Sequence, residues 1–291
     1  MQLDKNKILS SEYDKVLLSF YRVIINKFPL SNMDNLISQL NTIDITKNPS
    51  SIKEFIIKGI KDNPCGYYPE SNKILLIKDN VKDYHLYHEL FHMLSTYRSD
   101  NTIYSGFSQG NRKTYVTIGD GLNEGYTQLL KERYFGIDDN ESYFYMLQKH
   151  IAKHLEIIVG RRTMEKLYVN ADLEGLVNQL EKYCNKEVIL RFVNDVDYIN
   201  KNIKDEKLND YVTLKLKDSL LFLLNSFIVK QSMLYNKALL DDKSYKENIE
   251  KYLELLVNPL YYKGKEYQAL TYEDVEFILY SNNLLPSNSR H

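Results

Sequence analysis

Residues 88–92 of this 291-residue chain are His-Glu-Leu-Phe-His, and this pentapeptide constrains the fold more than any other segment. Residues four apart on an α-helix lie one turn above each other, so His88 and His92 leave the same helix face and can bind one metal ion. Glu89 is offset from His88 by about 100° around the helix axis, which places its carboxylate within reach of a metal-bound water. The pattern predicts a helical zinc-binding motif of the HExxH type.

The residues around the pentapeptide support a helix. Between residues 83 and 97, Leu86, Leu90, Phe91 and Leu94 recur at helical spacing and predict a buried stripe, away from the face that carries the histidines. Two histidines four apart can also be packed or solvated side chains without a metal. The glutamate between them, and a carboxylate further along the chain, favour the metal site.

A catalytic zinc site needs a third protein ligand and an open fourth position. His85 does not fit, because residues 85 to 92 span about 10.5 Å of helix axis, whereas Zn–N bonds are about 2.0–2.1 Å long. The extended motif HExxHxxGxxH requires Gly at 95 and His at 98, but the chain has Ser95 and Arg98. The remaining downstream acids are Asp100, Asp120, Glu124 and Glu132.

Glu124 is the strongest of these candidates because it lies in a predicted helix. Asp120 or Asn123 could cap the start of a helix over residues 119–130, whose leucines and Tyr126 would form one apolar face. Gly125 costs about 1 kcal/mol in a helix relative to alanine. We attribute this cost to a close approach of two helices that share a metal.

Together, the HELFH motif and the segment Leu-Asn-Glu-Gly-Tyr-Thr at 122–127 resemble the gluzincin class of zinc metallopeptidases. The glutamate of the second segment follows His92 by 32 residues, as part of an Asn-Glu-Gly sequence. The likeness is particularly to the small bacterial and phage-type zincins with a glutamate helix of this kind. It covers roughly a quarter of the chain, from about residue 65 to residue 136.

The resemblance implies roles for individual residues. One zinc ion per chain would be bound by His88, His92 and Glu124, and Glu89 would be the catalytic base. In thermolysin-like members an aspartate four residues after the third ligand often orients a zinc-binding histidine, and here that position is Gln128. The residue that orients the ligands is therefore either Asp120 or Gln128.

A further donor is expected to stabilise the oxyanion of the reaction. Tyr126, two residues after Glu124, is the candidate that we place at the site, and the alternatives are His85, His150, His154 and the tyrosines of the C-terminal half. The GxMEN motif, with which aminopeptidases of this class hold a substrate amino terminus, is absent. The resemblance therefore favours an endopeptidase.

Two short strands are predicted before the HExxH helix. Residues 65–68 and 73–78 have strand composition, and the turn-rich sequence Pro-Glu-Ser-Asn joins them. The edge of such a hairpin can bind an extended peptide through main-chain hydrogen bonds. Tyr67 and Tyr68 are therefore candidate substrate-binding residues, and the alternative is a hairpin with a structural role only. His85 is a third candidate because we place it at the edge of the cleft, and the alternative is an ordinary surface histidine.

The rest of the chain has mostly helical patterns. We predict a predominantly helical α+β fold with a zincin-like catalytic core that contains a small antiparallel sheet and an active-site helix. The chain would comprise an N-terminal helical segment at 1–62, the catalytic core at 63–138, and a helical C-terminal domain at 139–291 that completes the cleft.

Charge and composition disfavour two classes of partner. With 38 basic and 39 acidic residues the net charge is −1, which offers nucleic acid no basic surface. Apolar runs are too short for a membrane span and no signal sequence is visible, so we expect a cytoplasmic protein in which Cys65 and Cys184 are reduced. His150 and His154 are also four apart, but they flank an apolar stripe and are not expected to bind a metal.

These patterns predict zinc-dependent hydrolysis of peptide bonds in a peptide or protein substrate, with Glu89 as general base. The alternative is a non-catalytic interaction protein that keeps the zincin fold and uses the zinc structurally. An intact Glu89 disfavours this alternative, because a structural site closes its fourth position and has no use for a base.

Overall fold

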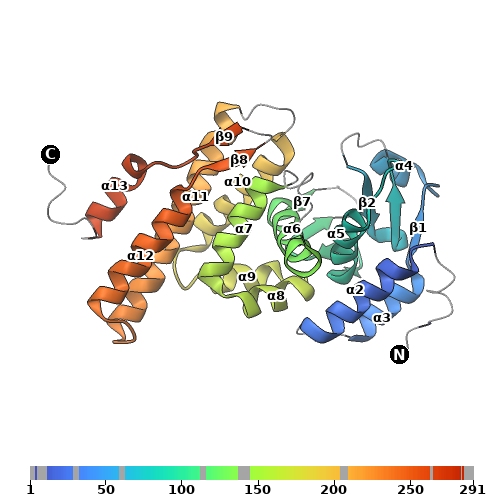
Figure 1. The fold of residues 1–291 in the computed structure, drawn as a ribbon, viewed down its shortest axis with the longest axis horizontal. Helices are drawn as coiled ribbons and strands as arrows, with labels where there is room; N and C mark the ends of the chain where they lie inside the picture. Colours follow the sequence, from blue (N-terminus) through green and yellow to red (C-terminus); the bar gives the residue numbers. More distant parts are fainter. Residues whose placement is uncertain are drawn as a thin grey trace. The chain divides into compact units, whose positions relative to one another are not determined.

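The computed structural model describes residues 4, 12–28, 33–58, 63–111, 116–136, 145–203, 209–262, 265–282 and 284. Helices dominate these residues, and their strands form three small sheets (Figure 1). The expected predominantly helical α+β fold is therefore confirmed. The chain divides into two compact units, of which the first comprises residues 1–118, 126–142 and 161–173, and the second comprises residues 119–125, 143–160 and 174–291.

The described N-terminal residues of the first unit form α2 (Asp14–Lys27), α3 (Met33–Thr42) and α4 (Ile52–Lys58). These helices lie within the N-terminal helical segment that the sequence predicts at residues 1–62. Phe20 of α2 is completely buried, and its ring meets the ring of Phe91 edge-on at 5.2 Å. Phe91 belongs to α5 (Asp83–Leu94), the helix that carries the HExxH motif. The N-terminal helices therefore contribute to the core behind this motif.

The first sheet has the strand order β1-β3-β2, with β1 (Asp44–Thr46), β2 (Cys65–Tyr68) and β3 (Lys73–Leu76). β2 and β3 form the expected antiparallel hairpin, joined by a 3-10 helix, η1 (Pro69–Ser71), and by Asn72 in the left-handed conformation. β1 pairs with β3 in parallel, so this sheet is mixed rather than antiparallel throughout, whereas the sheet that follows α5 is antiparallel. A three-residue strand that pairs with a distant segment is too short to show a periodic pattern.

A four-stranded antiparallel meander follows α5. Its strands are β4 (Thr96–Ser99), β5 (Thr102–Ser105), β6 (Ser108–Asn111) and β7 (Thr117–Ile118), and it leads directly into α6 (Asp120–Phe135). The chain turns at Gly106, whose φ of 56° is a left-handed conformation that glycine adopts readily. Gly110 and Asn111, whose residue types are common in turns, instead end β6. Residues 112–115, next to it, lie outside the described part.

The later turns of α6 belong to the first unit, where they pack against α5 and α8 (Arg161–Val169). The rings of Tyr87 in α5 and Phe135 in α6 stack with centroids 3.8 Å apart. The hydroxyl groups of Thr127 in α6 and Tyr168 in α8 are 2.7 Å apart and buried. The first contact holds α6 beside the HExxH helix, and the second holds it against α8.

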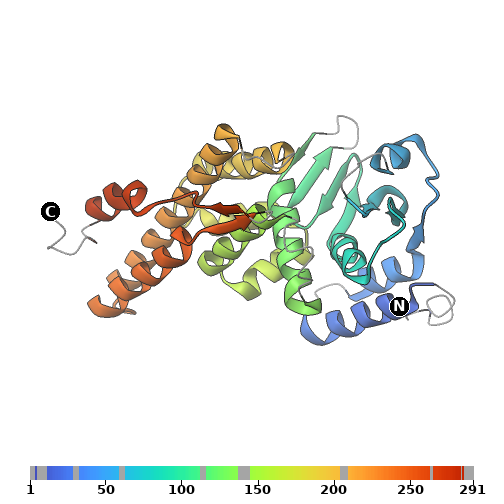
Figure 2. The ribbon, with the colours of Figure 1, turned by 45° about the horizontal axis from the view of Figure 1, so that its top comes forward.

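The second unit is built mainly from helices. They are α7 (Met146–Val159), α9 (Leu173–Leu180), α10 (Lys186–Asn202), α11 (Asp210–Asn236), α12 (Asp242–Val257) and α13 (Tyr272–Ser281), with a hairpin of β8 (Leu260–Tyr262) and β9 (Lys265–Tyr267). α11 and α12 lie side by side as a long helical hairpin (Figure 2). Within the described residues, no helix is long and apolar enough to span a membrane.

Candidate metal centre

Helix α5 presents His88 and His92 on one face because four residues make just over one helical turn. Its other side is anchored in the core, where Leu90 and Phe91 are completely inaccessible to solvent. The two imidazole rings have centroids 4.8 Å apart, and their Nε2 atoms are 3.1 Å apart. Both histidines are more than nine-tenths buried. The sequence spacing therefore produces a converging histidine pair.

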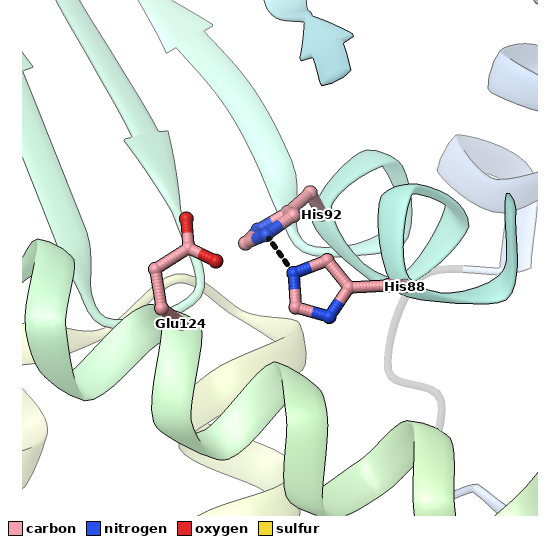
Figure 3. Close-up of side chains that lie close together, drawn as sticks. All are labelled: His88, His92 and Glu124. Carbon is pink, nitrogen blue, oxygen red and sulfur yellow. Dashed lines mark hydrogen bonds between the residues drawn. The ribbon is translucent and has the colours of Figure 1, made fainter. Parts of the chain in front are cut away.

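Helix α6 brings Glu124 to this pair. One ligand atom from each of His88, His92 and Glu124 lies within 4.8 Å of the others (Figure 3). Two nitrogens bound to one tetrahedral zinc ion at about 2.05 Å would be about 3.3 Å apart, close to the 3.1 Å between the Nε2 atoms. Within the described ranges, no other set of three His, Cys, Asp or Glu side chains is arranged to hold a metal ion.

Gln128, one turn after Glu124 in α6, fixes the tautomer of His88. The amino group of Gln128 donates to Oε1 of Glu132 at 2.9 Å, so its carbonyl oxygen faces Nδ1 of His88 at 3.2 Å. Nδ1 of His88 is then the N–H donor, and Nε2 keeps the lone pair that a metal requires. The structure thus brings Gln128 to the metal centre, together with Glu132, which the sequence suggested only as a metal ligand.

Glu89 follows His88 in α5 and is buried. Its Oε2 accepts a hydrogen bond of 2.7 Å from the main-chain N–H of Tyr67 in β2. β2 is an edge strand whose ladder partner is β3, so this N–H points away from the sheet and can reach the helix. The contact orients the Glu89 carboxylate and connects the edge strand directly to the HExxH motif.

Tyr67 and Tyr68, two expected substrate-binding residues, are packed into the hairpin. The Tyr67 hydroxyl lies 3.0 Å from Oδ1 of Asn72 and 3.3 Å from Oε1 of Gln39. Burial raises the pKa of the Tyr67 hydroxyl, so it is a neutral hydrogen-bond donor. Tyr68 is 8% exposed. Contact of their side chains with a substrate stays a prediction.

His85 and Tyr126 lie in different surroundings. Nδ1 of His85 accepts the main-chain N–H of Lys82 at 2.9 Å, in the first turn of α5. Tyr126 is completely buried, with its ring 5.4 Å from the rings of both Phe107 and Tyr168. A fully buried phenol favours a packing role in the first unit over the catalytic role that its position in the sequence suggested.

Asp197 of α10 is a residue that sequence reasoning missed. Its carboxylate accepts the main-chain N–H groups of Gly119 at 2.7 Å and Gly121 at 2.8 Å, at the start of α6. Asp120, which we expected as a cap or as an orienting residue, lies close enough to Asp197 for its charge to raise the Asp197 pKa, although burial raises that pKa more. No local pattern could reveal this contact, because more than 70 residues separate the partners.

His150 and His154 of α7 form a second histidine pair, in the second unit. Their ring centroids are 4.5 Å apart, and the His154 ring meets the Tyr252 ring edge-on at 5.2 Å. Burial, together with nearby lysines, lowers the pKa of His150 to about 4, and burial lowers that of His154 to about 3. Both are therefore neutral at pH 7. No third imidazole, thiol or carboxylate from the described chain joins them as a ligand.

Comparison of the chain with protein-family models, with curated proteins and with solved structures gave no match. The function of the chain must therefore be inferred from the chemistry of the site. A site is more informative than a fold, since one fold can support many activities. The most informative feature of the site is the convergence of the His88, His92 and Glu124 side chains.

Proposed function

We propose that this chain is a zinc-dependent peptidase of the gluzincin type with a zincin-like catalytic core. The observation that carries the proposal is the convergence of His88, His92 and Glu124, with Glu89 next to the first histidine in the same motif. Two imidazoles and one carboxylate form a donor set typical of catalytic zinc sites, which keep the fourth position open. Structural zinc sites typically use thiolates and close all four positions.

Each residue of the site has a chemical role in this proposal. Zinc, when bound, would polarise the scissile carbonyl and lower the pKa of its water. Glu89 would accept the proton of this water on its carboxylate and pass it to the leaving amine. The N–H of Tyr67 would hold Glu89 in one orientation, and Gln128 would hold His88 in the tautomer whose Nε2 is a ligand.

Two features support a peptide as the substrate. β2 is an edge strand, and edge strands bind extended peptides through main-chain hydrogen bonds. The hydrogen bond between Tyr67 and Glu89 places this edge next to the proposed base. Because Glu89 already accepts the outward-facing N–H of Tyr67, an extended segment would pair with other outward-facing main-chain groups of β2, beside the proposed base. The absence of a GxMEN motif favours cleavage within a chain over removal of amino-terminal residues.

The test of the proposal is the substitution Glu89→Gln. Glutamine keeps the size of the side chain and an acceptor for the Tyr67 N–H, but it removes the base. We expect the variant to fold, to keep its zinc and to lose peptide hydrolysis by a factor of at least about 100. Cleavage of a peptide library, measured at equal zinc content, provides the comparison. Glu187→Gln, at an exposed position of α10, is the matched control and should cleave like the wild type.

The same experiment distinguishes the alternative of a non-catalytic interaction protein. A wild-type protein that contains zinc but cleaves no member of the library would favour a structural metal. Equal cleavage by the wild type and by Glu89→Gln would remove Glu89 from the mechanism. Either result contradicts the proposed reaction.

A further inference from the structure

The residue that precedes α6 has no side chain with which to cap the helix. Helix residues begin at Asp120, and the preceding residue is Gly119, which has φ of 85° and no side-chain acceptor. The first N–H groups of a helix have no partner within the helix and need an acceptor from elsewhere. Asp197, which is 5% exposed, provides both of its carboxylate oxygens to two of these N–H groups. It acts as an N-cap supplied by a distant helix.

The first two turns of α6 also lie very close to the main chains of α10 and α7. A Cβ atom on Gly121 would lie less than 3.0 Å from the carbonyl oxygen of Val196, the residue before Asp197 in α10. A Cβ atom on Gly125 would lie equally close to the carbonyl oxygen of Gln148 in α7. The two glycines are four residues apart and therefore share one helix face. This face can pack against α10 and α7 only because glycine has no Cβ atom at these two positions.

These contacts bear on the metal centre because Glu124 lies between them. It follows Gly121 by three residues and precedes Gly125, within the part of a helix that frays when its first N–H groups lack an acceptor. A frayed first turn would move the Glu124 carboxylate relative to the histidine pair. Because a metal ligand must be held to within about 0.5 Å, small displacements of this kind weaken binding.

We propose that Asp197 is a positioning residue of the metal centre, which holds Glu124 in place by capping the start of α6. The inference rests on the proposed function, since it assumes that Glu124 is a metal ligand. Asp197 is buried, so its carboxylate loses hydration, and the N–H groups of Gly119 and Gly121, together with the charge of Lys201, compensate this loss. Loss of the carboxylate should therefore affect α6 first and the rest of the second unit less.

The experiment compares three variants of the full chain. Asp197→Ala removes both hydrogen bonds, and Asp197→Asn keeps the shape and one acceptor oxygen. Asp241→Ala is the control for loss of a helix cap elsewhere in the second unit, because the exposed Asp241 caps α12 through the N–H of Ser244 at 2.6 Å. The readouts are the dissociation constant of zinc, from competition with a chelator, and amide hydrogen exchange of the metal-free proteins. Hydrolysis is not needed for either readout.

We expect Asp197→Ala to raise the dissociation constant of zinc at least about tenfold, the lower end of the effect of residues that orient metal ligands. Asp197→Asn should give a smaller increase, and Asp241→Ala none. Hydrogen exchange should be faster at residues 120–124 in Asp197→Ala, while α5 keeps its protection. This pattern would show that the carboxylate positions Glu124.

Other outcomes would overturn the inference. Equal zinc affinity of Asp197→Ala and wild type would show that α6 keeps Glu124 in place without the cap. Equal losses of affinity in Asp197→Ala and Asp241→Ala would show a general effect of stability. If Asp197→Ala does not fold, a zinc affinity of Asp197→Asn equal to that of the wild type contradicts the inference. A wild-type protein that binds no zinc would instead contradict the proposed function itself.

Discussion

At the scale of single residues, the histidine pair shows why a cation fits this site. The Nε2 atoms of His88 and His92 are 3.1 Å apart, and two nitrogen lone pairs at this distance repel unless a proton or a cation lies between them. Because the Gln128 carbonyl faces Nδ1 of His88, Nε2 of this ring is an acceptor. A metal ion satisfies both rings at once, and the nearby Glu124 carboxylate offsets part of its charge.

The first prediction follows from the ligand set. The wild-type protein should contain about one zinc ion per chain, and His92→Ala or Glu124→Ala should each reduce this content sharply, because two remaining ligands hold zinc poorly. Elemental analysis of the purified proteins measures the change. His150→Ala is a suitable control, since it removes a histidine from the other pair with the same spacing. Full zinc content in Glu124→Ala would place the third ligand elsewhere.

A second prediction concerns the orientation of His88. Gln128→Leu keeps the approximate size of the side chain but removes the acceptor of the Nδ1 proton. We expect the zinc dissociation constant to rise about 10- to 100-fold, with little change in fold. Gln128→Glu restores an acceptor but replaces the hydrogen bond to Glu132 with a contact of two carboxylates, so it should recover only part of the affinity that Gln128→Leu loses. The dissociation constants are measured by titration against a chelator. Identical zinc affinities in all three proteins would show that this hydrogen bond does not orient His88 for metal binding.

At the scale of elements, helices with a regular apolar stripe could be predicted, whereas contacts between distant segments could not. The stripe of α5 identified the HExxH helix, although the helix ends at Leu94 rather than near Tyr97, which lies in β4. The position of Glu124 in α6 was also predictable, because local spacing and a resemblance both indicated it. The Asp197 cap depends on a contact across more than 70 residues, and no local pattern carries that information.

The expected role of Gly125 in α6 was only partly correct. We expected Gly125 to allow a close approach between the two metal-binding helices. The close approach is real, but its partner is the main chain of Gln148 in α7. The requirement for a small residue is visible in the sequence as a glycine within a helical pattern. The identity of the neighbour is a property of the packed structure.

A third prediction follows from this contact. Gly125→Ala gains about 1 kcal/mol of helix propensity, but its methyl group overlaps the rigid carbonyl oxygen of Gln148. Overpacking of this kind costs about 1–3 kcal/mol, and we expect a net decrease in the free energy of unfolding in urea. Gly110→Ala is the comparison, because its methyl group meets only the side chain of Thr117, at 3.0 Å. A more stable Gly125→Ala protein would contradict the contact.

At the scale of the whole molecule, the compact units do not follow the order of the chain. The sequence suggested successive segments at 1–62, 63–138 and 139–291. The two compact units are interleaved along the chain, since residues 119–125 group with the second unit and residues 161–173 with the first, and the division into three segments stays a prediction. Composition and turn residues mark a boundary where helices end, but a change of unit inside α6 leaves the helical pattern uninterrupted. Such a boundary can be seen only from three-dimensional contacts.

The last prediction concerns the stability of the second unit in acid. Burial lowers the pKa of His150 to about 4 and that of His154 to about 3, whereas both should titrate near 6.5 in the unfolded chain. The folded state therefore binds fewer protons below pH 6.5, and the stability provided by the neutral pair is complete above that pH. This stability is lost as the pH falls from about 6.5 towards 4. Each histidine contributes a loss of about 1.4 kcal/mol per pH unit in this range.

The measurement is the free energy of unfolding of the metal-free protein in urea at pH 7.5, 6.0 and 5.0. The wild type should lose stability more steeply than the double variant His150→Gln/His154→Gln, in which neither side chain titrates. Because the comparison is a difference between two proteins, the contributions of His88 and His92 cancel. The two substitutions also change packing, which shifts the free energy of unfolding at every pH, so the quantity that decides is the slope of this free energy with pH. Parallel slopes would show that the pair can be protonated within the folded second unit without cost.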